Sequence, residues 1–326
     1  MIIDSHAHFV PRPIIDALRG GKPEFPNLAS EATDNSVKLS FSGGAWTRSL
    51  SPGLFDAAQR LDWMDSQNID RQVVGPWLDM TGYELPEAEG VAWSTWLNAE
   101  LLSFSKDNAR FVPLATLPLQ SGEAAAKVLR DCMRDGFHGA MIGTQPKGKG
   151  GVLDDADLAP FWQAASETGA AVVIHPMYDC GDRRADNYGM ANAIGRITDT
   201  ALTLTRMLYA GMPSKYSGAK IVIPIGGAAL PFVMGRLMRN YALHKDELAN
   251  PQEGFGALWF DTVVHDAATL KFLADQVGWS RIMMGSDKPF PIGDPEPLGI
   301  VDACDLNAAD RDAVVRGTAT DLFRLQ

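Results

Sequence analysis

The most suggestive residues for chemistry are three histidines and one aspartate, each at the end of an apolar segment. His6 and His8 are separated by one residue at the end of segment 2–9. Side chains two apart on a strand point to the same side, so both imidazoles can reach one metal ion. A lone His-x-His also occurs by chance, but two core histidines side by side would be costly to bury. We therefore predict that this pair binds metal.

Two later residues complete a possible ligand set. His175 ends the run Ala-Ala-Val-Val-Ile-His-Pro, and Asp287 stands in Met-Met-Gly-Ser-Asp-Lys-Pro-Phe-Pro. Alone, His175 would as often be a hydrogen-bonded core histidine, and Asp287 a turn residue. Beside His6 and His8 they predict a site for one divalent ion, Zn²⁺ first and Mn²⁺ or Fe²⁺ as alternatives. Asp287 could also carry a proton during catalysis.

The elements that would position these residues alternate between strands and helices. Strand-like runs are expected at 2–9, 71–76, 111–117, 140–144, 171–176, 220–226, 258–264 and 281–286. Helical patterns are expected at 57–66, 92–104, 123–133, 158–168, 199–209, 231–243, 267–277 and 308–323.

This alternation predicts an α/β fold, a (β/α)₈ TIM barrel of the metal-dependent hydrolase type. An open doubly wound sheet is disfavoured because the first strand ends in His-Ala-His and lacks a glycine-rich phosphate loop. Residues 1–326 are expected to form a single domain. Segment 20–53, rich in Gly, Pro, Ser and Asn, is interpreted as an insertion over the barrel mouth, with a hairpin around 37–41.

Composition excludes several classes of function. The formal net charge is −11, which opposes nucleic acid or an anionic membrane as a partner, but not a small acidic substrate. No apolar run approaches the length of a membrane span. The chain shows no signal peptide, and its three cysteines, Cys132, Cys180 and Cys304, have no CxxC spacing. These features favour reduced, structural cysteines and a cytoplasmic location.

The motifs together resemble a known family. Asp-Ser-His-Ala-His-Phe, Val-Val-Ile-His-Pro, Ile-Gly-Gly-Ala-Ala-Leu-Pro-Phe-Val-Met-Gly-Arg, Asp-Thr-Val-Val-His-Asp and Gly-Ser-Asp-Lys-Pro-Phe-Pro are similar to segments of the amidohydrolase-related decarboxylases. They most resemble aminocarboxymuconate semialdehyde decarboxylase, with the resorcylate-type decarboxylases as relatives. The resemblance implies a barrel, one catalytic divalent metal on the four residues above, a homodimer and release of carbon dioxide.

The same resemblance suggests how a substrate is held. Arg236 falls where the family places an arginine that reaches the substrate carboxylate of the neighbouring subunit, a role that suits a planar guanidinium. Arg48, in the insertion, is a second candidate, although a solvated surface arginine is equally compatible with its position. Phe290, three residues after Asp287, is also expected to contact substrate.

One position departs from the family. Where the family reads His-Gly-Gly after the sixth strand, this chain reads Ile225-Gly226-Gly227. Isoleucine can neither donate nor accept a proton, and loss of a positioned acid–base group costs about 10²–10⁴-fold in rate. Asp287 is the first candidate to replace it, and His265 the second. Lys288 stands where relatives carry an aromatic residue; it could bind an acidic group or point outward.

Three functions therefore remain open. The leading hypothesis is a metal-dependent decarboxylase that acts on a small unsaturated or aromatic carboxylic acid. The first alternative is a metal-dependent hydrolase of a cyclic amide or lactone, which would use the same four ligands. The second alternative is a non-catalytic barrel that supports an active paralogue.

Overall fold

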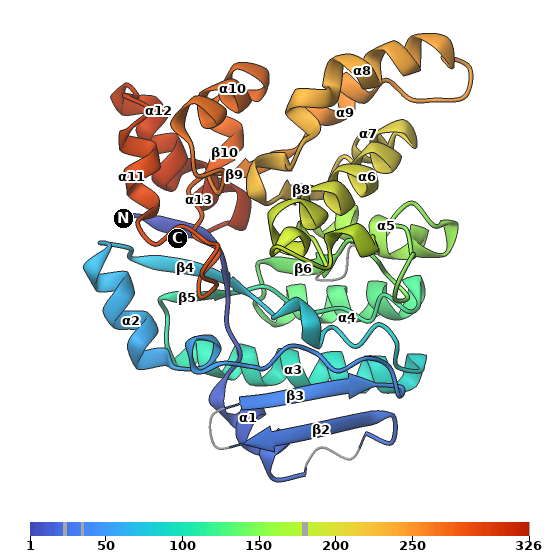
Figure 1. Cartoon of the computed structure of the whole chain (residues 1–326), viewed down its shortest axis with the longest axis vertical. Coiled ribbons are helices and arrows are strands. Elements are labelled where there is room, and N and C mark those ends of the chain that lie inside the picture. The colour runs from blue at the N-terminus through green and yellow to red at the C-terminus, as the bar shows by residue number, and fades with distance from the viewer. Residues whose placement is uncertain (22–24, 34–35, 178–181, 326) are drawn as a thin grey trace.

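Eight parallel strands close into a barrel in the computed structural model, which describes residues 1–21, 25–33, 36–177 and 182–325 (Figure 1). The barrel strands are β1 Ile3–His8, β4 Arg71–Gly75, β5 Phe111–Pro113, β6 Gly139–Gly143, β7 Ala171–His175, β8 Lys220–Ile223, β9 Trp259–Asp261 and β10 Ile282–Met283.

Two short bridges complete the ring. Continuous ladders join β1-β4-β5 and β6-β7-β8-β9-β10. Parallel bridges then connect Ala115 to Ala140 and Ala7 to Lys288. At the second bridge, His8 N donates to Lys288 O at 2.7 Å and Asp287 N donates to His6 O at 2.8 Å. The first strand is therefore fastened directly to the segment that carries Asp287.

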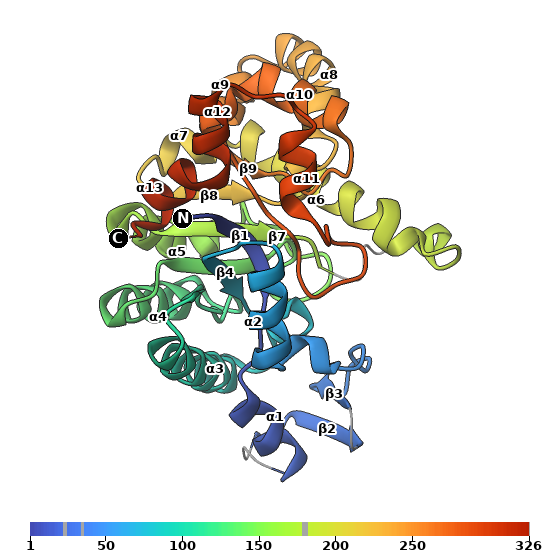
Figure 2. The ribbon, with the colours of Figure 1, turned by 90° about the vertical axis from the view of Figure 1, so that its left-hand side faces the viewer.

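Helices cover the outside of the barrel (Figure 2). The helices of the described residues are α1 Arg12–Arg19, α2 Ala57–Ser66, α3 Glu87–Asp107, α4 Gly122–Asp135, α5 Ala159–Thr168, α6 Arg196–Tyr209, α7 Met212–Lys215, α8 Leu230–Leu243, α9 Pro251–Gly256, α10 Ala267–Val277, α11 Pro297–Asp302, α12 Ala308–Asp312 and α13 Thr318–Phe323. Side-chain caps begin three of those that follow strands: Asp56 for α2, Ser121 for α4 and Asp266 for α10.

Alternate strand residues divide between two apolar layers. Val73, Val112 and Val173 face the barrel interior, where Phe323 of α13 packs beneath them. Their neighbours, such as Val74, face outward to the helices. The barrel is thus filled at its amino-terminal end, which leaves its carboxyl-terminal end for chemistry.

A β-bulge in β1 changes which residues face inward. The β1–β4 register shifts between Asp4 and Ala7. Ile3 belongs to the interior layer, whereas Ala7 and Phe9 pack in the outer layer. A regular strand would place residue 7 on the same side as residue 3. The bulge therefore turns His6 and His8 into the barrel while keeping Ile3 inside.

Segment 20–53 contains an antiparallel hairpin of β2 Leu28–Thr33 and β3 Ser36–Phe41, which lies against α1 and α3 in Figure 1. The chain after it, from Gly44 to Arg48, lines a pocket of about 380 Å³ together with residues that follow β4, β6 and β7. Residues from the expected insertion therefore lie beside loops that follow the carboxyl ends of three strands.

The strands and helices agree closely with the sequence-based expectations, with differences at their ends. α2 and α10 have the expected bounds, whereas β5 and the last three strands are shorter than expected. β8 stops pairing with its neighbours at Ile223, and Ile225–Gly227 then forms a 3₁₀ turn. Short helices α1, α7, α9 and α11 were not predicted.

Two predictions made on composition can also be compared with the structure. Cys132 and Cys304 are buried free thiols, and Cys180 lies outside the described residues. In the described part of the chain, every helix is too short or too polar to cross a bilayer.

Candidate metal centre

His6, His8, His175 and Asp287 meet at the carboxyl-terminal end of the barrel. The two histidines of β1 and the histidine that ends β7 are each at most 2% exposed, and Asp287 is 3% exposed. One ligand atom from each residue lies within 4.8 Å of the other three. The sequence-predicted ligand set is therefore brought together in space.

Each imidazole is oriented by an acceptor on its Nδ1 atom. His6 Nδ1 lies 2.7 Å from Asp261 Oδ2. His8 Nδ1 lies 2.9 Å from the carbonyl oxygen of Pro76, and His175 Nδ1 lies 2.9 Å from that of Pro176. Carbonyls and carboxylates only accept, so the proton of each ring resides on Nδ1. The Nε2 lone pairs are left facing the centre of the cluster.

The atoms that face the centre lack hydrogen-bond partners. They are the Nε2 atoms of the three histidines and Oδ1 of Asp287, all buried. Asp287 Oδ1 lies 3.2 Å from His8 Nε2 and 3.5 Å from His6 Nε2. Four buried polar atoms without hydrogen-bond partners at one point would be costly in an apolar interior. Three nitrogens and one carboxylate oxygen fit a divalent transition metal ion, which would satisfy all four.

The pKa values in the cluster follow from this crowding. Burial would lower the pKa of His6, but the carboxylates of Asp287 and Asp261 outweigh it and raise the pKa to about 9. Burial lowers the pKa of His8, and it lowers that of His175 well below the usual value. Burial opposes ionisation of Asp287, yet the neighbouring imidazoles hold its pKa below the usual value. In the metal-free protein His6 therefore carries a second proton, on Nε2, opposite an ionised Asp287, and a metal ion would have to displace that proton.

A buried polar network supports the strand that carries the first two ligands. Asp4 accepts hydrogen bonds from His6 N at 3.1 Å, Gln72 Nε2 at 2.8 Å, and the amide and hydroxyl of Ser286. Arg60 donates to Gln72 Oε1 at 2.7 Å and to the carbonyl of His8 at 3.1 Å. Burial raises the pKa of Asp4. The network fixes the backbone on both sides of the β1–Ser286 joint.

Beside the metal centre lies a pocket of about 240 Å³ that contains Asp287. His265 lines it, exposed and with a φ of 60°. Ile225 lines it too, with a φ of 56° that a β-branched residue rarely adopts. The structure therefore brings His265 and Ile225 to the same pocket as Asp287.

Phe290 lies against His8, and Arg48 lies against Phe290. The Phe290 ring centroid is 5.1 Å from that of His8. The guanidinium of Arg48 lies 5.6 Å from the Phe290 centroid and 5.3 Å from the Trp77 ring. It also donates two 3.0 Å hydrogen bonds to the carboxylate of Asp79. Arg48 therefore approaches the ligand His8 through Phe290, and its guanidinium already binds the carboxylate of Asp79.

Two other residues singled out in the sequence point elsewhere within this chain. Arg236 is exposed on α8, outside the set of described residues that line the pocket beside Asp287. Lys288 Nζ lies 4.6 Å from the ring centroid of Trp63 on α2. Lys288 thus packs against a covering helix, and burial with nearby Arg60 lowers its pKa.

Sequence reasoning assigned no role to two residues of the site. Asp261, at the end of β9, accepts from His6 and from the amides of Gly226 and Val263 at 2.9 and 3.1 Å. Its position at a strand end was a usable signal. Arg196, the first residue of α6, is only 4% exposed and lines the pocket beside Asp287. No local pattern marks it as buried.

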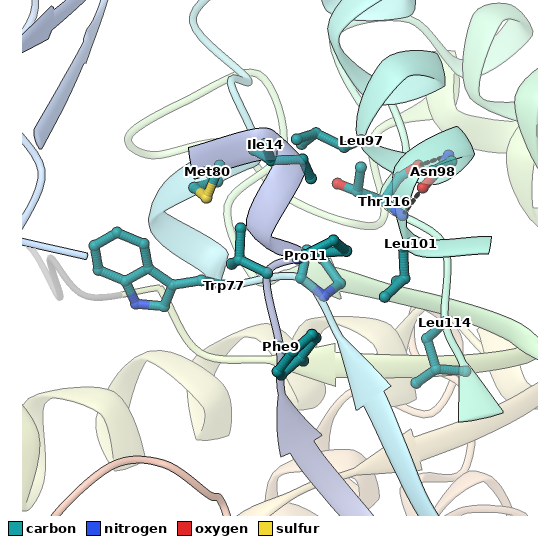
Figure 3. Close-up of a pocket in the computed structure, with 12 residues that line it drawn as sticks. Phe9, Pro11, Ile14, Trp77, Met80, Leu97, Asn98, Leu101, Leu114 and Thr116 are labelled. Carbon is teal, nitrogen blue, oxygen red and sulfur yellow. Dashed lines mark hydrogen bonds between the residues drawn. The ribbon is translucent and has the colours of Figure 1, made fainter. Parts of the chain in front are cut away.

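A small apolar cavity lies behind β1 (Figure 3). It has a volume of about 20 Å³, and most of its lining, including Phe9, Pro11 and Leu101, is apolar. Asn98 and Thr116 exchange hydrogen bonds of 2.9 and 2.8 Å beside it. Its size admits no organic substrate. The cavity belongs to the packing around Pro76, whose carbonyl orients His8.

Comparisons with known proteins agree with this geometry. The profile of a family described as Amidohydrolase matches residues 3–325. A 2-amino-3-carboxymuconate-6-semialdehyde decarboxylase of Dictyostelium discoideum is 28% identical over 290 residues, which cover 86% of this chain and 80% of that protein. A gamma-resorcylate decarboxylase of a Polaromonas species is 27% identical over 293 residues, covering 82% and 87%.

Solved structures match the fold over its full length. A 5-carboxyvanillate decarboxylase from Sphingomonas paucimobilis superposes with a TM-score of 0.82 at 22% identity, covering 100% of this chain and 99% of that one. The corresponding enzyme from Novosphingobium aromaticivorans, solved with manganese and a nitrobenzoic acid, gives 0.81 at 21% identity, covering 100% and 96%. The predicted TIM barrel is confirmed.

Proposed function

The chain belongs to the amidohydrolase family, and we propose that it is a metal-dependent decarboxylase that releases carbon dioxide from a small aromatic or unsaturated carboxylic acid. The family resemblance inferred from the sequence is confirmed, and the chain is an enzyme. The decarboxylases among its relatives support the reaction type, and the acids in their names support the substrate class.

The observation that carries the proposal is the convergence of four unpartnered ligand atoms at the open end of the barrel. His6, His8, His175 and Asp287 would hold one divalent ion. When bound, that ion would supply a positive charge that orients the acid and draws electron density from it. We propose zinc, which three imidazoles and a carboxylate suit well; manganese is the alternative, because it occupies one related structure.

Loss of carbon dioxide requires one proton to replace it on the same carbon. We assign Asp287 to the transfer of that proton: ionised at rest, it would accept a proton from water and pass it to the carbon. Among the described residues it is the only carboxylate that lines the adjacent pocket. His265 lines the same pocket and is the second candidate. Ile225 supplies a wall there and no proton, so the reaction depends on these two groups.

The acid itself would be held from two sides. Phe290, against His8, would stack on an aromatic ring, and Arg48, above Phe290, would fix an anionic group. In this proposal, residues 20–53 shape the substrate pocket within a single catalytic domain. Arg236 would act from a partner subunit, since it is exposed on α8. We also propose a cytoplasmic location, in keeping with the two buried free thiols.

The first test is metal content, measured by mass spectrometry on protein purified without added metal or chelator. We expect about one equivalent per chain for the natural protein and for His244→Ala, since His244 is exposed on the end of α8. We expect loss of the ion in Asp287→Ala. A protein that holds no divalent ion even after reconstitution would contradict the proposal.

The reaction type is tested on the metal-loaded enzyme with carboxyl-labelled 2,6-dihydroxybenzoate and 5-carboxyvanillate. Release of labelled carbon dioxide would support the decarboxylase, and His265→Ala would lower the rate if His265 relays the proton. A ring-opened product with all carbons retained would instead identify a hydrolase.

A further inference from the structure

The residue that follows β6 binds the backbone next to the metal ligand His175. Gly143, the last residue of β6, is paired in register with His175 of β7. Thr144 donates its backbone amide to the carbonyl of His175 at 3.1 Å, and its hydroxyl oxygen accepts the amide of Met177 at 3.2 Å. One fully buried threonine therefore binds the chain on both sides of Pro176.

The amide that the Thr144 hydroxyl binds belongs to the peptide group that orients the His175 ring. The carbonyl of Pro176 and the N–H of Met177 form one planar unit, in which the two groups point in opposite directions. The carbonyl end lies 2.9 Å from His175 Nδ1. Because the unit is rigid, a hydrogen bond that fixes its N–H also fixes the direction of the carbonyl.

This support matters more for His175 than for the other two imidazoles. The acceptors of His6 and His8 come from other strands, through Asp261 at the end of β9 and Pro76 just after β4. The acceptor of His175 is the next residue of its own chain segment. Its direction is therefore set by whatever holds the backbone after β7, and Thr144 holds it at two points.

Asp199 of α6 fixes the direction of the Thr144 hydroxyl. The hydroxyl donates to Asp199 Oδ2, and Asp199 Oδ1 accepts from Gln145 Nε2 at 3.1 Å. A hydroxyl has a single proton, and a carboxylate only accepts. The proton therefore points to Asp199, and a lone pair on the same oxygen is left for the amide of Met177.

We propose that Thr144 is a positioning residue for the metal centre. Its hydroxyl, held by Asp199, fixes the peptide after Pro176, so that Nδ1 of His175 meets its acceptor and Nε2 faces the ion. This inference rests on the proposed function, because it assumes that a divalent ion binds at the four ligands. It assigns the role to the hydroxyl of Thr144 and not to its methyl group.

The test measures zinc affinity of the full-length protein by competition with a chelator, and the visible absorption of the protein loaded with Co²⁺. Thr144→Val replaces the hydroxyl by a methyl group, and we expect zinc affinity about 10- to 100-fold lower, with an altered cobalt spectrum. Thr144→Ser keeps the hydroxyl and should stay within about threefold of the natural protein.

The matched control is Thr198→Val, one residue before Asp199. Thr198 is exposed, and its hydroxyl donates to the carbonyl of Ile194 at 3.0 Å. This variant loses a hydroxyl that has no contact with the segment after β7, so its zinc affinity and cobalt spectrum should match those of the natural protein.

The melting temperature of the metal-free variants separates positioning from a purely structural role. A lower melting temperature of Thr144→Val with natural zinc affinity and cobalt spectrum would overturn the inference. So would an equal loss of zinc affinity in Thr144→Ser and Thr144→Val, because packing of the methyl group would then be the cause. If Thr144→Val does not fold, Asp199→Ala replaces it, with an expected loss of about three- to tenfold. Unchanged zinc affinity in that variant would also overturn the inference.

Two further outcomes separate this inference from the proposed function. The expected changes in zinc affinity without release of carbon dioxide would support the role of Thr144 and contradict the proposed reaction. A natural protein that binds no divalent ion would overturn both.

Discussion

Each ligand histidine is oriented by a hydrogen-bond acceptor that faces its Nδ1 atom. Pro76 and Pro176 offer neutral carbonyls to His8 and His175, whereas Asp261 offers a charge to His6. The charge of Asp287 and then that of Asp261 outweigh burial, and together they raise the pKa of His6 to about 9, which makes it the most basic of the three rings. At neutral pH a metal ion must therefore displace a proton from His6.

This displacement gives metal binding a defined pH dependence. The metal-free protein binds the proton and the metal-bound protein releases it, so rising pH favours the bound state. We expect apparent affinity to increase about tenfold per pH unit below the pKa of His6, and to level off above about 9. Calorimetry in two buffers of different ionisation enthalpy should count one released proton at pH 7.

Asp261→Asn provides the variant for this experiment. The amide lowers the pKa of His6, so the affinity should depend less on pH. It also removes a negative charge beside the ligand and weakens the orientation of the ring, so we expect metal affinity at high pH to be about 10- to 100-fold lower. Asp275→Asn, an exposed change on α10, is the control. An affinity that stayed constant across this pH range would contradict the account of His6.

The ligand residues could be predicted because a polar residue at the end of an apolar run is a local signal. His6, His8, His175 and Asp287 all carry it. Asp261 carries it too, but its partner His6 lies 255 residues away, so its function depends on barrel closure. Arg196 stands just before a predicted amphipathic helix, where the sequence does not distinguish a buried guanidinium from a solvated one.

At the scale of elements, the turn after β8 shapes the wall of the site. Ile225, Gly226 and Gly227 all have positive φ, between 55° and 77°. Gly226 donates its amide to Asp261 Oδ1, and a Cβ there would lie 2.1 Å from Val264 Cγ1. The turn therefore couples the chain after β8 to the carboxylate that orients His6.

A pair of glycine substitutions tests this coupling. Gly226→Ala should destabilise the fold by about 1–3 kcal/mol, because of strain and the contact with Val264, and it should also weaken metal binding through Asp261. Gly235→Ala in α8 meets no atom within 4 Å and should stabilise by about 0.5–1 kcal/mol. Denaturant unfolding measures both. If both substitutions changed the free energy of unfolding equally, the turn after β8 would have no special role in supporting the site.

The element pattern was largely readable from the sequence, since strands and amphipathic helices differ in period. The residues at which the strands and helices end could not be predicted in the same way. β9 and β10 were expected to run three residues past Asp261 and Met283, because apolar residues continue there. In the structure those residues leave the ladder to build the site. The β1 bulge was equally hidden, because it depends on pairing with β4 and not on β1 alone.

At the scale of the whole molecule, α8 and its surroundings expose apolar surface. Phe232 is 86% exposed and Phe272 is 42% exposed, and both line a pocket of about 380 Å³. Arg236 stands one turn further along α8, also exposed. Exposed aromatic residues around a hollow are typical of protein interfaces. This surface supports the proposal of a homodimer in which Arg236 reaches the neighbouring site.

Analytical ultracentrifugation tests that assembly. We expect the natural protein to sediment with twice the mass of one chain, and Phe232→Glu to shift it toward the monomer, because a carboxylate would be buried in the contact. Tyr188→Glu, at a residue 96% exposed and outside that surface, should leave the mass unchanged. A natural protein that sediments as a monomer would rule out the dimer.

The joint between β1 and the segment after β10 has a consequence for biosynthesis. Ser286 donates to Asp4 across 282 residues of chain. At about 5–20 residues per second, the ribosome needs roughly 15–55 s to make that interval. Until then β1 cannot pair with the segment after β10, and His6 and His8 lack the carboxylate of Asp287. The nascent chain therefore exposes a strand edge and an incomplete ligand set, and the centre can take its ion with all four ligands only after the last barrel strand has emerged.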